Sequence, residues 1–543
     1  PYRAAGPAPP KGAPGDPLRG VSVRYLRQEL LAEVAAAGLP RGAPVYRIEG
    51  RVIRGKAPKQ VCPRDGRPGC AYVDALAGED SVGHSTHMLS YAWSYSVSAI
   101  AETLASYCGS RGLDGSRTYF WICCLCINQH RVVESLESKE SIPFEQFRDE
   151  FRSHVEGIGH LVAMLTPWHK PRYLERVWTL FEFYTALELG PEQCQLEIVM
   201  PEEDVEDLAS HAFDADILEE VYRAMAAASV EDAQASVSSD RENILEMIRT
   251  GKGCKEVELR IARHLQQYFV TELYVYGKKH LSSLKSEDAI RYLLQIGRLY
   301  RRSGLAGQAS RLLRRAQGQL EAAGLQASEL GALVFRSVGS HRTALEDYHG
   351  GLLAYDKAVR IYKELGLDRT HEYALLLDFV GDAQRKSQNF DGALAAFQEA
   401  KALYEELGAA DSTDFAFLLS NVGDLLQARG DLEGAQAVME EAHAIYSRHH
   451  SLDGPDCARL QVSRGWLHVA KDELDAAEAL FESAQAVLER KCMMESDQGK
   501  RLLAGLSRVR ALRGAGGPGG EPEPGGRAEA PAGGEGATCG LQP

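Results

Sequence analysis

The stretch Trp121-Ile-Cys-Cys-Leu-Cys-Ile-Asn-Gln129 is an apolar run that ends on two neutral amide side chains. A second apolar run, Arg176-Val-Trp-Thr-Leu-Phe-Glu182, comes later in the chain and ends on a carboxylate. Apolar walls that carry a few placed polar groups are typical of ligand sites. We expect both runs to line one cleft, with Glu182 as its most reactive group.

Strand and helix patterns alternate on both sides of these runs, over residues 81–225. Short apolar runs predict four buried strands, at 87–91, 118–125, 160–166 and 195–200. Strands that alternate with helices predict a flavodoxin-like parallel sheet with helices on both faces, and ligands bind such sheets beyond the carboxyl ends of the strands. Asn128, Gln129, Thr166 and Trp168 follow predicted strands, so we expect them at that edge.

The second half of the chain repeats with a period of 42 residues. A glycine recurs at positions 297, 339, 381, 423 and 465, with a small residue twelve positions after each and an alanine nineteen positions after each. Small residues at fixed offsets let the two helices of a hairpin approach closely. We expect Tyr355, Phe397 and Phe481 to fill the gaps between neighbouring hairpins. The pattern predicts an all-α superhelix over residues 286–510, with five repeats and an end helix.

The other segments lie before, between and after these two parts. Residues 1–80 begin with a Pro- and Gly-rich stretch and are expected to be mostly disordered or irregular, with one short helix near 23–37. Residues 226–285 have helical periodicity and are expected to form a helical linker. Residues 511–543 are rich in Gly, Pro and Ala and are expected to be a disordered tail.

Composition limits the classes of partner. The chain has 61 Lys+Arg against 76 Asp+Glu, a formal net charge of −15, which argues against nucleic acid or an anionic membrane as partner. No apolar run approaches the length of about 18 residues that a membrane span needs. The eleven cysteines are scattered, which favours a reducing, cytoplasmic location. The chain begins at Pro1 without an initiator Met, and we expect the natural protein to begin earlier.

Three cysteines crowd into the first run. On a strand, Cys123 and Cys124 point to opposite faces and only Cys124 and Cys126 share one, so we interpret the three as core residues and predict no metal site. Cys62 and Cys70 are separated by seven residues and have no paired Cys-x-x-Cys motif. A turn-rich loop is the simpler interpretation of that segment, and zinc is the alternative.

Two further features have alternative interpretations. Asn128 and Gln129 have side chains able to hold a ligand hydroxyl or carboxamide, or to cap a turn. Glu182 lies four residues after Trp178, so one helical face carries an indole and a carboxylate. A carboxylate beside an aromatic ring in a half-dry cleft has a raised pKa. The alternatives are a surface glutamate or an ion-pair partner of Arg176.

The repeat resembles the tetratricopeptide repeat, in the 42-residue form found in kinesin light chains. The glycine, small residue, aromatic residue and alanine of each unit match that family. The units depart from it because the later helix-ending Pro is missing and the first-helix aromatic residue is absent from most repeats. The resemblance implies a protein or peptide partner in the groove of the superhelix.

Three motifs resemble, in order and spacing, those of the heterokaryon-incompatibility (HET) domain of fungal cell-death proteins. They are His87-Met-Leu-Ser-Tyr-Ala-Trp93 and the two runs quoted above. The HET domain is related in fold to Toll/interleukin-1 receptor (TIR) domains, whose Trp-x-x-x-Glu helix carries the catalytic glutamate of the NAD-cleaving members. Trp178 and Glu182 match that helix, and Ser90 and Tyr91 match the strand that opens the fold.

The resemblance implies that the domain cleaves NAD, which would be a substrate, with no resident cofactor. Glu182 would be catalytic, holding the ribose hydroxyls and stabilising oxocarbenium-like charge. One carboxylate suffices because nicotinamide is a good neutral leaving group, unlike the leaving groups of ordinary glycosidases. The ligand contacts implied in this way are Ser90, Tyr91, Trp93, Asn128, Gln129 and Trp178.

The chain departs from both families at the site. Cys123 stands where the HET pattern has Asp, Ser94 where Gly is usual, and Ala92 where many TIR domains have Arg. No P-loop or Gly-x-Gly-x-x-Gly follows a strand, which argues against a dehydrogenase or an NTPase.

Two functions are consistent with these features. One is a signalling protein of cell-death or defence type, whose NAD-cleaving domain is controlled by the repeats and acts as a homo-oligomer. The other is a non-catalytic adaptor or scaffold, whose α/β domain only self-associates.

Overall fold

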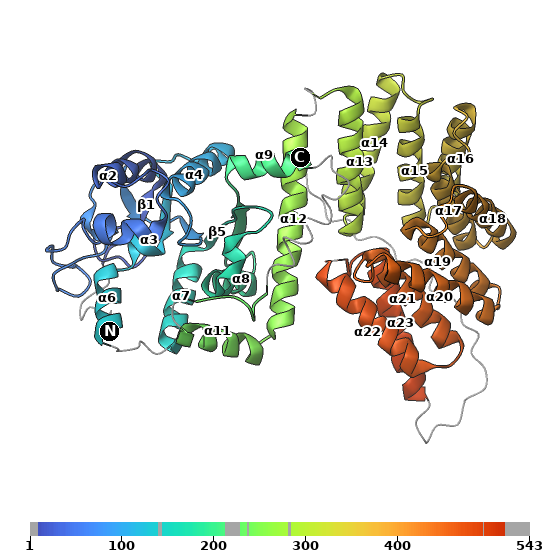
Figure 1. Ribbon diagram of the computed structural model, residues 1–543. Helices are drawn as coiled ribbons and strands as arrows, with labels where there is room; N and C mark the ends of the chain where they lie inside the picture. Colours follow the sequence, from blue (N-terminus) through green and yellow to red (C-terminus); the bar gives the residue numbers. More distant parts are fainter. Residues whose placement is uncertain are drawn as a thin grey trace.

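The computed structural model describes residues 9–138, 144–211, 229–235, 238–280, 284–491 and 493–515. Figure 1 shows a part built around a sheet, an array of paired helices, and the long helix α12 between them. The predicted tail beyond residue 515 lies outside the described residues, as do residues 1–8 and 212–228.

Six strands form one mixed sheet within the described residues, in the order β2-β1-β4-β3-β5-β6. They are β1 (Arg19–Ser22), β2 (Val82–His84), β3 (His87–Ser90), β4 (Tyr119–Ile122), β5 (His160–Met164) and β6 (Gln195–Val199). The strands β4, β3, β5 and β6 are parallel. Along the chain these are the second, first, third and fourth of the parallel strands, which is the flavodoxin-like order. The predicted fold class, α/β followed by all-α, is confirmed.

The N-terminal segment differs from the prediction of a mostly disordered or irregular region. From residue 9 it packs against the sheet, adding β1 and β2 as antiparallel strands at one edge. A helical stretch follows β1, built from α1 (Val23–Tyr25), η1 (Leu26–Leu30) and α2 (Leu31–Ala36), where one short helix is predicted. Val21 and Val34 are fully buried in the main core. This packing could not be predicted from the Pro- and Gly-rich sequence, because its few apolar residues are spaced irregularly.

The predicted strand 118–125 is too long. β4 ends at Ile122, and Cys123–Cys126 form one helical turn, α5. The Ile127 amide donates to the Cys123 carbonyl at 3.0 Å, and the Ile122 amide donates to the Cys126 thiol at 3.3 Å. A continuous apolar run is the same for a buried strand and a buried helical turn, so its periodicity did not separate the two.

Helices cover the parallel strands. Those of the α/β part are α4 (Val97–Arg111), α6 (Gln129–Ser138), α7 (Phe144–Ile158), α8 (Val177–Leu189) and α9 (Glu202–Ser210). α7 and α8 contact each other and both contact β3 and β5. The described part of the predicted linker consists of α11 (Ser238–Thr250) and α12 (Cys254–His280). α12 packs against α8 and α9 on one side and α13 on the other.

Five helical hairpins and a last helix form the array. They are α13 (Ser286–Arg302) with α14 (Ala306–Ala322), α15 (Glu329–Ala344) with α16 (Tyr348–Glu364), α17 (His371–Lys386) with α18 (Phe390–Glu406), α19 (Thr413–Ala428) with α20 (Leu432–Arg448), α21 (Pro455–Ala470) with α22 (Leu474–Arg490), and α23 (Asp497–Ala515). The first helices of neighbouring hairpins contact one another, whereas the second helices do so far less. The first helices therefore line the inside of the curve.

The helix starts recur with the same period as the glycines. Ser328, Thr370 and Ser412 lie 42 residues apart, and each side-chain oxygen accepts a hydrogen bond from a backbone amide in the first turn of the next helix. Such N-caps stabilise a helix by about 1 kcal/mol each. In these three units the repeat therefore encodes where the first helix begins, as well as how it packs.

The repeated glycines face aromatic rings of the second helix in the same hairpin. A Cβ atom added at Gly339, Gly381 or Gly465 would lie within 2.5 Å of the ring of Tyr355, Phe397 or Phe481, respectively. The prediction that these rings fill the space between neighbouring hairpins is therefore incomplete. They also pack within their own hairpin, whereas Tyr355 stacks on Phe379 of the next hairpin, with 6.4 Å between centroids, and Phe481 faces Gly505 of α23.

We expect Gly381→Ala to destabilise the array by about 1–3 kcal/mol, because the new methyl group overpacks the buried Phe397 ring. Helix propensity alone would favour alanine by about 1 kcal/mol. Gly318→Ala in α14 is the matched control, since its Cβ meets no atom within 4 Å, and we expect it to stabilise the protein. Denaturant unfolding of both variants measures the difference, and destabilisation by Gly318→Ala alone would contradict the packing argument.

Candidate functional site

The first candidate site lies where β3 ends. Ser90, its last residue, is fully buried, and its hydroxyl donates a hydrogen bond to the Glu182 carboxylate on α8. The same hydroxyl lies 2.6 Å from Tyr173 OH, which donates to the Thr179 carbonyl at 3.0 Å. A strand end, a helix and the turn before that helix thus meet at one carboxylate.

The protonation state of Glu182 follows from its burial, which the contact with Ser90 opposes. Burial raises its pKa to about 8, and the hydrogen bond from Ser90 offsets part of the shift. At neutral pH the acid form therefore predominates, and it can give a hydrogen bond or a proton to a ligand.

Cys123 lies beside this carboxylate, directly after β4. Its half-buried thiol accepts a hydrogen bond from the Trp93 indole at 3.3 Å and lies 3.5 Å from Tyr91 OH. Burial, with a smaller effect of the Glu182 charge, raises the pKa of Cys123 to about 11, so the thiol is neutral. The structure thus places Tyr91, Trp93 and Glu182 near Cys123, and Ser90 against Glu182, at the carboxyl ends of β3 and β4.

Asn128 and Gln129 make local contacts instead. The Asn128 amide donates to the Gly69 carbonyl at 3.0 Å, and its oxygen accepts from the His130 backbone amide at 3.1 Å. The Gln129 amide reaches the Cys123 carbonyl at 3.4 Å. Both side chains are buried. These contacts favour a capped turn that anchors the loop containing Gly69.

Trp178 lies one turn before Glu182 on α8. Its ring packs edge-on against Phe181, with 6.0 Å between ring centroids. Burial raises the pKa of Asp240 on α11, and a hydrogen bond with the Trp178 side chain offsets part of that shift. The indole therefore contacts α11, whereas Glu182 contacts the end of β3.

Thr166 and Trp168 hold α9. The Thr166 hydroxyl donates to Asp204 at 2.5 Å, and the Trp168 backbone amide donates to the same carboxylate at 3.1 Å. The Trp168 indole donates to Asp207 at 2.7 Å. The two residues follow β5, as expected, but their polar groups are used within the protein.

Two members of the cluster are not among the residues predicted from the sequence to form the site. Cys123 is predicted there as a core residue, because it lies inside the predicted strand 118–125, which in the structure ends at Ile122. Tyr173 lies in the short turn η4 (Arg172–Glu175) before α8 and carries no sequence signal. Only the fold brings it to Ser90.

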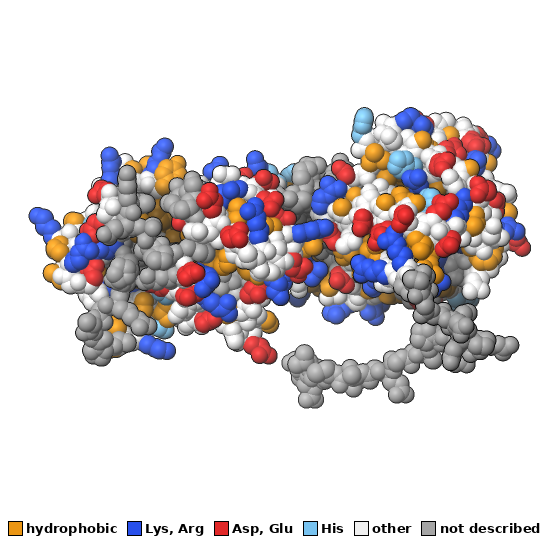
Figure 2. Space-filling model, turned by 90° about the horizontal axis from the view of Figure 1, so that it is seen from below, with side chains coloured by type: hydrophobic (Ala, Val, Ile, Leu, Met, Phe, Trp, Pro, Cys, Tyr) orange, Lys and Arg blue, Asp and Glu red, His pale blue; other side chains and the backbone are white. Residues whose placement is uncertain are grey.

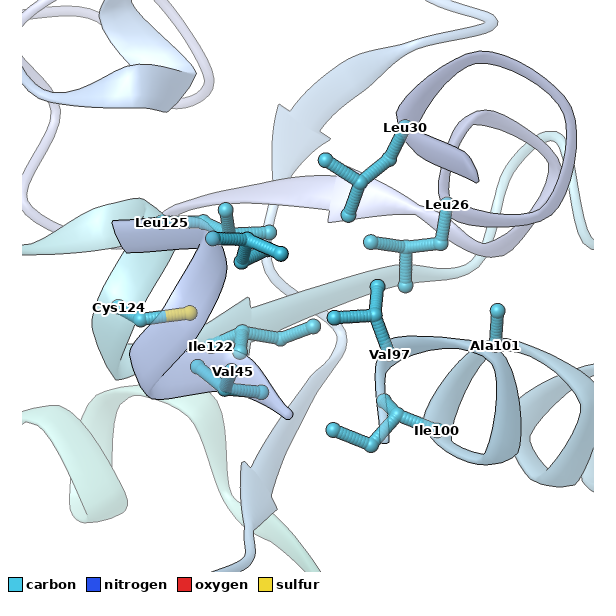
Figure 3. A pocket seen from close by; sticks show the side chains of 10 residues that line it. Leu26, Leu30, Val45, Val97, Ile100, Ala101, Ile122, Cys124 and Leu125 are labelled. Carbon is cyan, nitrogen blue, oxygen red and sulfur yellow. The ribbon is translucent and has the colours of Figure 1, made fainter. Parts of the chain in front are cut away.

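A small apolar pocket lies elsewhere in the α/β part. Figure 3 shows side chains from the N-terminal helices, α4, β4 and α5 converging on it, among them Leu26, Val97 and Ile122. No charged or hydrogen-bonding group other than the Cys124 thiol lines it. Neither Ser90 nor Glu182 belongs to this pocket, so it does not extend the carboxylate site.

The second candidate site is the inner face of the array. We define it by four residues on the successive first helices α15, α17, α19 and α21, namely Arg336, Phe379, Phe417 and Arg459. The Phe379 and Phe417 rings are half-buried and lie 6.1 Å apart. The Arg459 guanidinium lies 3.7 Å from the centre of the Phe417 ring, and that of Arg336 lies 6.0 Å from the centre of the Phe379 ring. Two aromatic rings flanked by cations therefore face the inside of the curve.

A buried polar row supports this face. The Asn421 amide donates to Asp378 at 2.8 Å, and Arg459 donates to the Asn421 oxygen at 2.7 Å. Burial raises the pKa of Asp378 to about 7, and the Asn421 hydrogen bond and the Arg459 charge oppose that shift. One hydrogen-bonded chain thus joins α17, α19 and α21 and fixes Arg459 over the Phe417 ring.

The outer surface is different in character. Figure 2 shows acidic and basic side chains mixed over the face of the molecule seen from below. In the described ranges, no group of three or more His, Cys, Asp or Glu side chains is placed to hold a metal ion. No described helix has both the length and the apolar character that a membrane crossing requires.

The comparisons with known proteins concern the array. Residues 414–490 match the tetratricopeptide repeat family model. No curated protein matches the sequence.

Several solved structures resemble the chain at low identity. BtubC (BKLC) from P. vanneervenii is 18% identical, with 50% of this chain and 97% of that chain covered and a TM-score of 0.33. A Podosopora anserina putative kinesin light chain with nearly identical TPR-like repeats is 13% identical, with 37% and 96% covered and a TM-score of 0.30. A Rap protein complexed with competence and sporulation factor is 12% identical, with 63% and 90% covered and a TM-score of 0.38.

Identities and TM-scores this low do not indicate a function for this chain. The family match, the 42-residue period and the hairpins agree with one another. The C-terminal part of the chain is therefore an array of tetratricopeptide repeats.

Proposed function

We propose that the array binds an extended segment of a partner protein on its inner face. The observation that carries the proposal is the pair of half-buried rings, Phe379 and Phe417, held between Arg336 and Arg459. Aromatic rings and arginines are the side chains that contribute most to binding energy in protein interfaces. The rigid support from Asn421 and Asp378 keeps the Arg459 guanidinium in place before a partner arrives, which lowers the entropic cost of binding.

A selection from a displayed library of random peptides, followed by fluorescence anisotropy on the full chain, tests this function. We expect selected peptides to lose at least about tenfold in affinity for Phe379→Ala/Phe417→Ala, because truncation of buried interface aromatic residues commonly costs more than 1–2 kcal/mol. Leu353→Ala, an exposed residue of the second helix α16, is the control. Equal binding by the double variant, or a library that yields no binder, would exclude the inner face.

We propose as a second function that the α/β part is a HET/TIR-like signalling domain that cleaves NAD at the nicotinamide-ribosyl bond. The specific observation in its favour is Glu182, a half-buried carboxyl group with a raised pKa, at the carboxyl ends of parallel strands where flavodoxin-like folds bind ligands. Bound NAD would replace the Ser90 contact with its ribose hydroxyls. The described cysteines are free thiols, which is consistent with action in the reducing cytoplasm.

Nicotinamide release from NAD by the full chain tests the second function. We expect activity that rises with pH through about 8, because the anion of Glu182 stabilises the oxocarbenium-like charge and forms as the group loses its proton. Glu182→Gln should abolish release, and Glu175→Gln, an exposed residue before α8, should not. If wild type and Glu182→Gln are equally silent, both free and in the self-associated form, the α/β part is non-catalytic and the adaptor function remains.

A further inference from the structure

The helix α12 is fastened to the helix that carries Glu182. Arg260 of α12 forms an ion pair with Glu188 of α8. One turn further along α12, the His264 ring packs edge-on against the fully buried Phe183 ring of α8, with 6.2 Å between centroids. Phe183 directly follows Glu182, so a shift of α12 acts on the backbone that positions this carboxyl group.

The same helix begins the array. Near its end the Tyr292 hydroxyl of α13 donates to the Leu273 carbonyl of α12. A Cβ at Gly277 would lie 2.2 Å from the Tyr292 ring, so the two helices are in direct contact there. α12 and the first hairpin therefore move together.

The other end of the array returns to α12. Lys255, in the first turn of α12, lies 2.6 Å from the carboxylate of Glu489 on α22, whose side chain is 9% exposed. Phe481, Leu488 and Leu502 of the last hairpin and α23 belong to the same continuous apolar core as α12 and α13. The middle hairpins form a separate core. The first and last hairpins also approach each other directly. A Cβ atom added at Gly304, between α13 and α14, would lie 3.0 Å from the side chain of Glu495, between α22 and α23.

These contacts make the array a closed turn whose two ends meet at one helix. In an open solenoid each repeat contacts only its neighbours, so its last hairpin cannot influence its first. Here Lys255 and Glu489 hold the last hairpin, Tyr292 holds the first, and Arg260 and His264 hold α8. Any widening of the turn must therefore break the contact with Glu489 or pull α12 along α8.

We propose that α12 couples the closure of the array to the position of Glu182. A protein segment on the inner face widens the turn, separates Lys255 from Glu489 and loosens α8. This step rests on the proposed function only in naming a protein segment as the trigger. The coupling itself is a property of the chain without ligand, because α12 contacts α8, α13 and Glu489 in the absence of any partner.

Hydrogen exchange on the full chain, without ligand, tests the coupling. We expect Lys255→Glu and Glu489→Lys each to speed exchange about tenfold in α22 and α23 and also in α8, because each variant opposes like charges at a contact with one buried partner. The swapped double variant, Lys255→Glu/Glu489→Lys, should restore slow exchange in all three helices. Lys279→Glu, an exposed lysine of α12, is the control.

The outcomes separate the inference from the proposed functions. Faster exchange in α22 that leaves α8 unchanged would overturn the coupling, as would a swapped variant that exchanges like the single variants. Failure of peptide selection or of NAD cleavage would leave this exchange pattern intact, because neither ligand is present in the experiment. A further arm adds a peptide selected on the array, and faster exchange in α8 on binding supports the direction proposed.

Discussion

We expect Glu182→Gln to make the protein more stable at pH 8 by about 3 kcal/mol, and to leave its stability unchanged at pH 4. The side-chain amide of glutamine is the closest neutral copy of a protonated carboxyl group. Its amide oxygen can accept the hydrogen bond from Ser90 as the carboxyl group does, so the contacts through Tyr173 to Thr179 survive. The substitution removes only the ability to ionise.

The direction of this pH dependence follows from the difference between the pKa of Glu182 in the folded state and its pKa in the unfolded state. The folded protein holds the pKa of Glu182 at about 8, above the ordinary value of 4.5. Below pH 4.5 the group is protonated in both the folded and unfolded states and contributes no difference. As pH rises towards 8, only the unfolded state ionises, so wild-type stability falls relative to the variant. The partial exposure of the side chain reduces the effect below the full value for that shift.

Thermal unfolding of wild type and variant across pH 4 to 9 measures the difference, with Glu175→Gln as the exposed control. A constant difference between wild type and Glu182→Gln over that range would show that the pKa of Glu182 is the same in the folded and unfolded states, so that the group is ionised at neutral pH. The chemistry proposed at β3 would then start from the anion, with no rise of activity through pH 8.

The second large effect concerns the end of the array. We expect Arg501→Ala to cost about 2–4 kcal/mol, because it leaves the Asp424 carboxylate, 2% exposed, without its bidentate partner. Burial raises the pKa of Asp424, but the charges of Arg501 and Arg385 outweigh burial and bring it to about 2. The pair therefore stabilises the fold above pH 4, and that contribution is lost as pH falls through about 2.

Arg513→Ala on the same helix is the control, because its partners Asp475 and Glu478 are fully and partly exposed, and such surface pairs contribute at most about 1 kcal/mol. Denaturant unfolding and hydrogen exchange in α23 report the loss. If both variants lose the same small amount, α23 is held by apolar contacts alone and Asp424 finds enough support in Arg385.

Periodic features were predictable from the sequence. The parallel strands and the hairpins appear there because burial on both faces of a strand, or on one face of a helix, leaves a regular apolar pattern. β1 was missed because the apolar residues near it are spaced irregularly, and the turn at Cys123 was missed because a continuous apolar run does not separate a strand from a helical turn. The antiparallel edge formed by β1 and β2 also depends on partners far away in the chain.

The candidate site was predictable only in part. Ser90 and Glu182 were found by resemblance to known motifs, and the structure places them in contact. Asn128 was selected for its position after a predicted strand, yet a loop more than fifty residues earlier takes up its amide. Neither that contact nor the Tyr173 hydroxyl has a local sequence signal, because both depend on how distant segments pack. The raised pKa of Glu182 likewise depends on burial that only the fold supplies.

The meeting of the two ends of the array has an evolutionary consequence. Solenoid proteins commonly gain or lose whole units, since each unit rests on its neighbours alone. In this chain, duplication or deletion of a 42-residue unit would separate Glu489 from Lys255. It would also remove Phe481 and Leu502 from the apolar core that they share with α12 and α13. The number of hairpins is therefore under structural constraint, and length variation in this lineage should be confined to loops and termini.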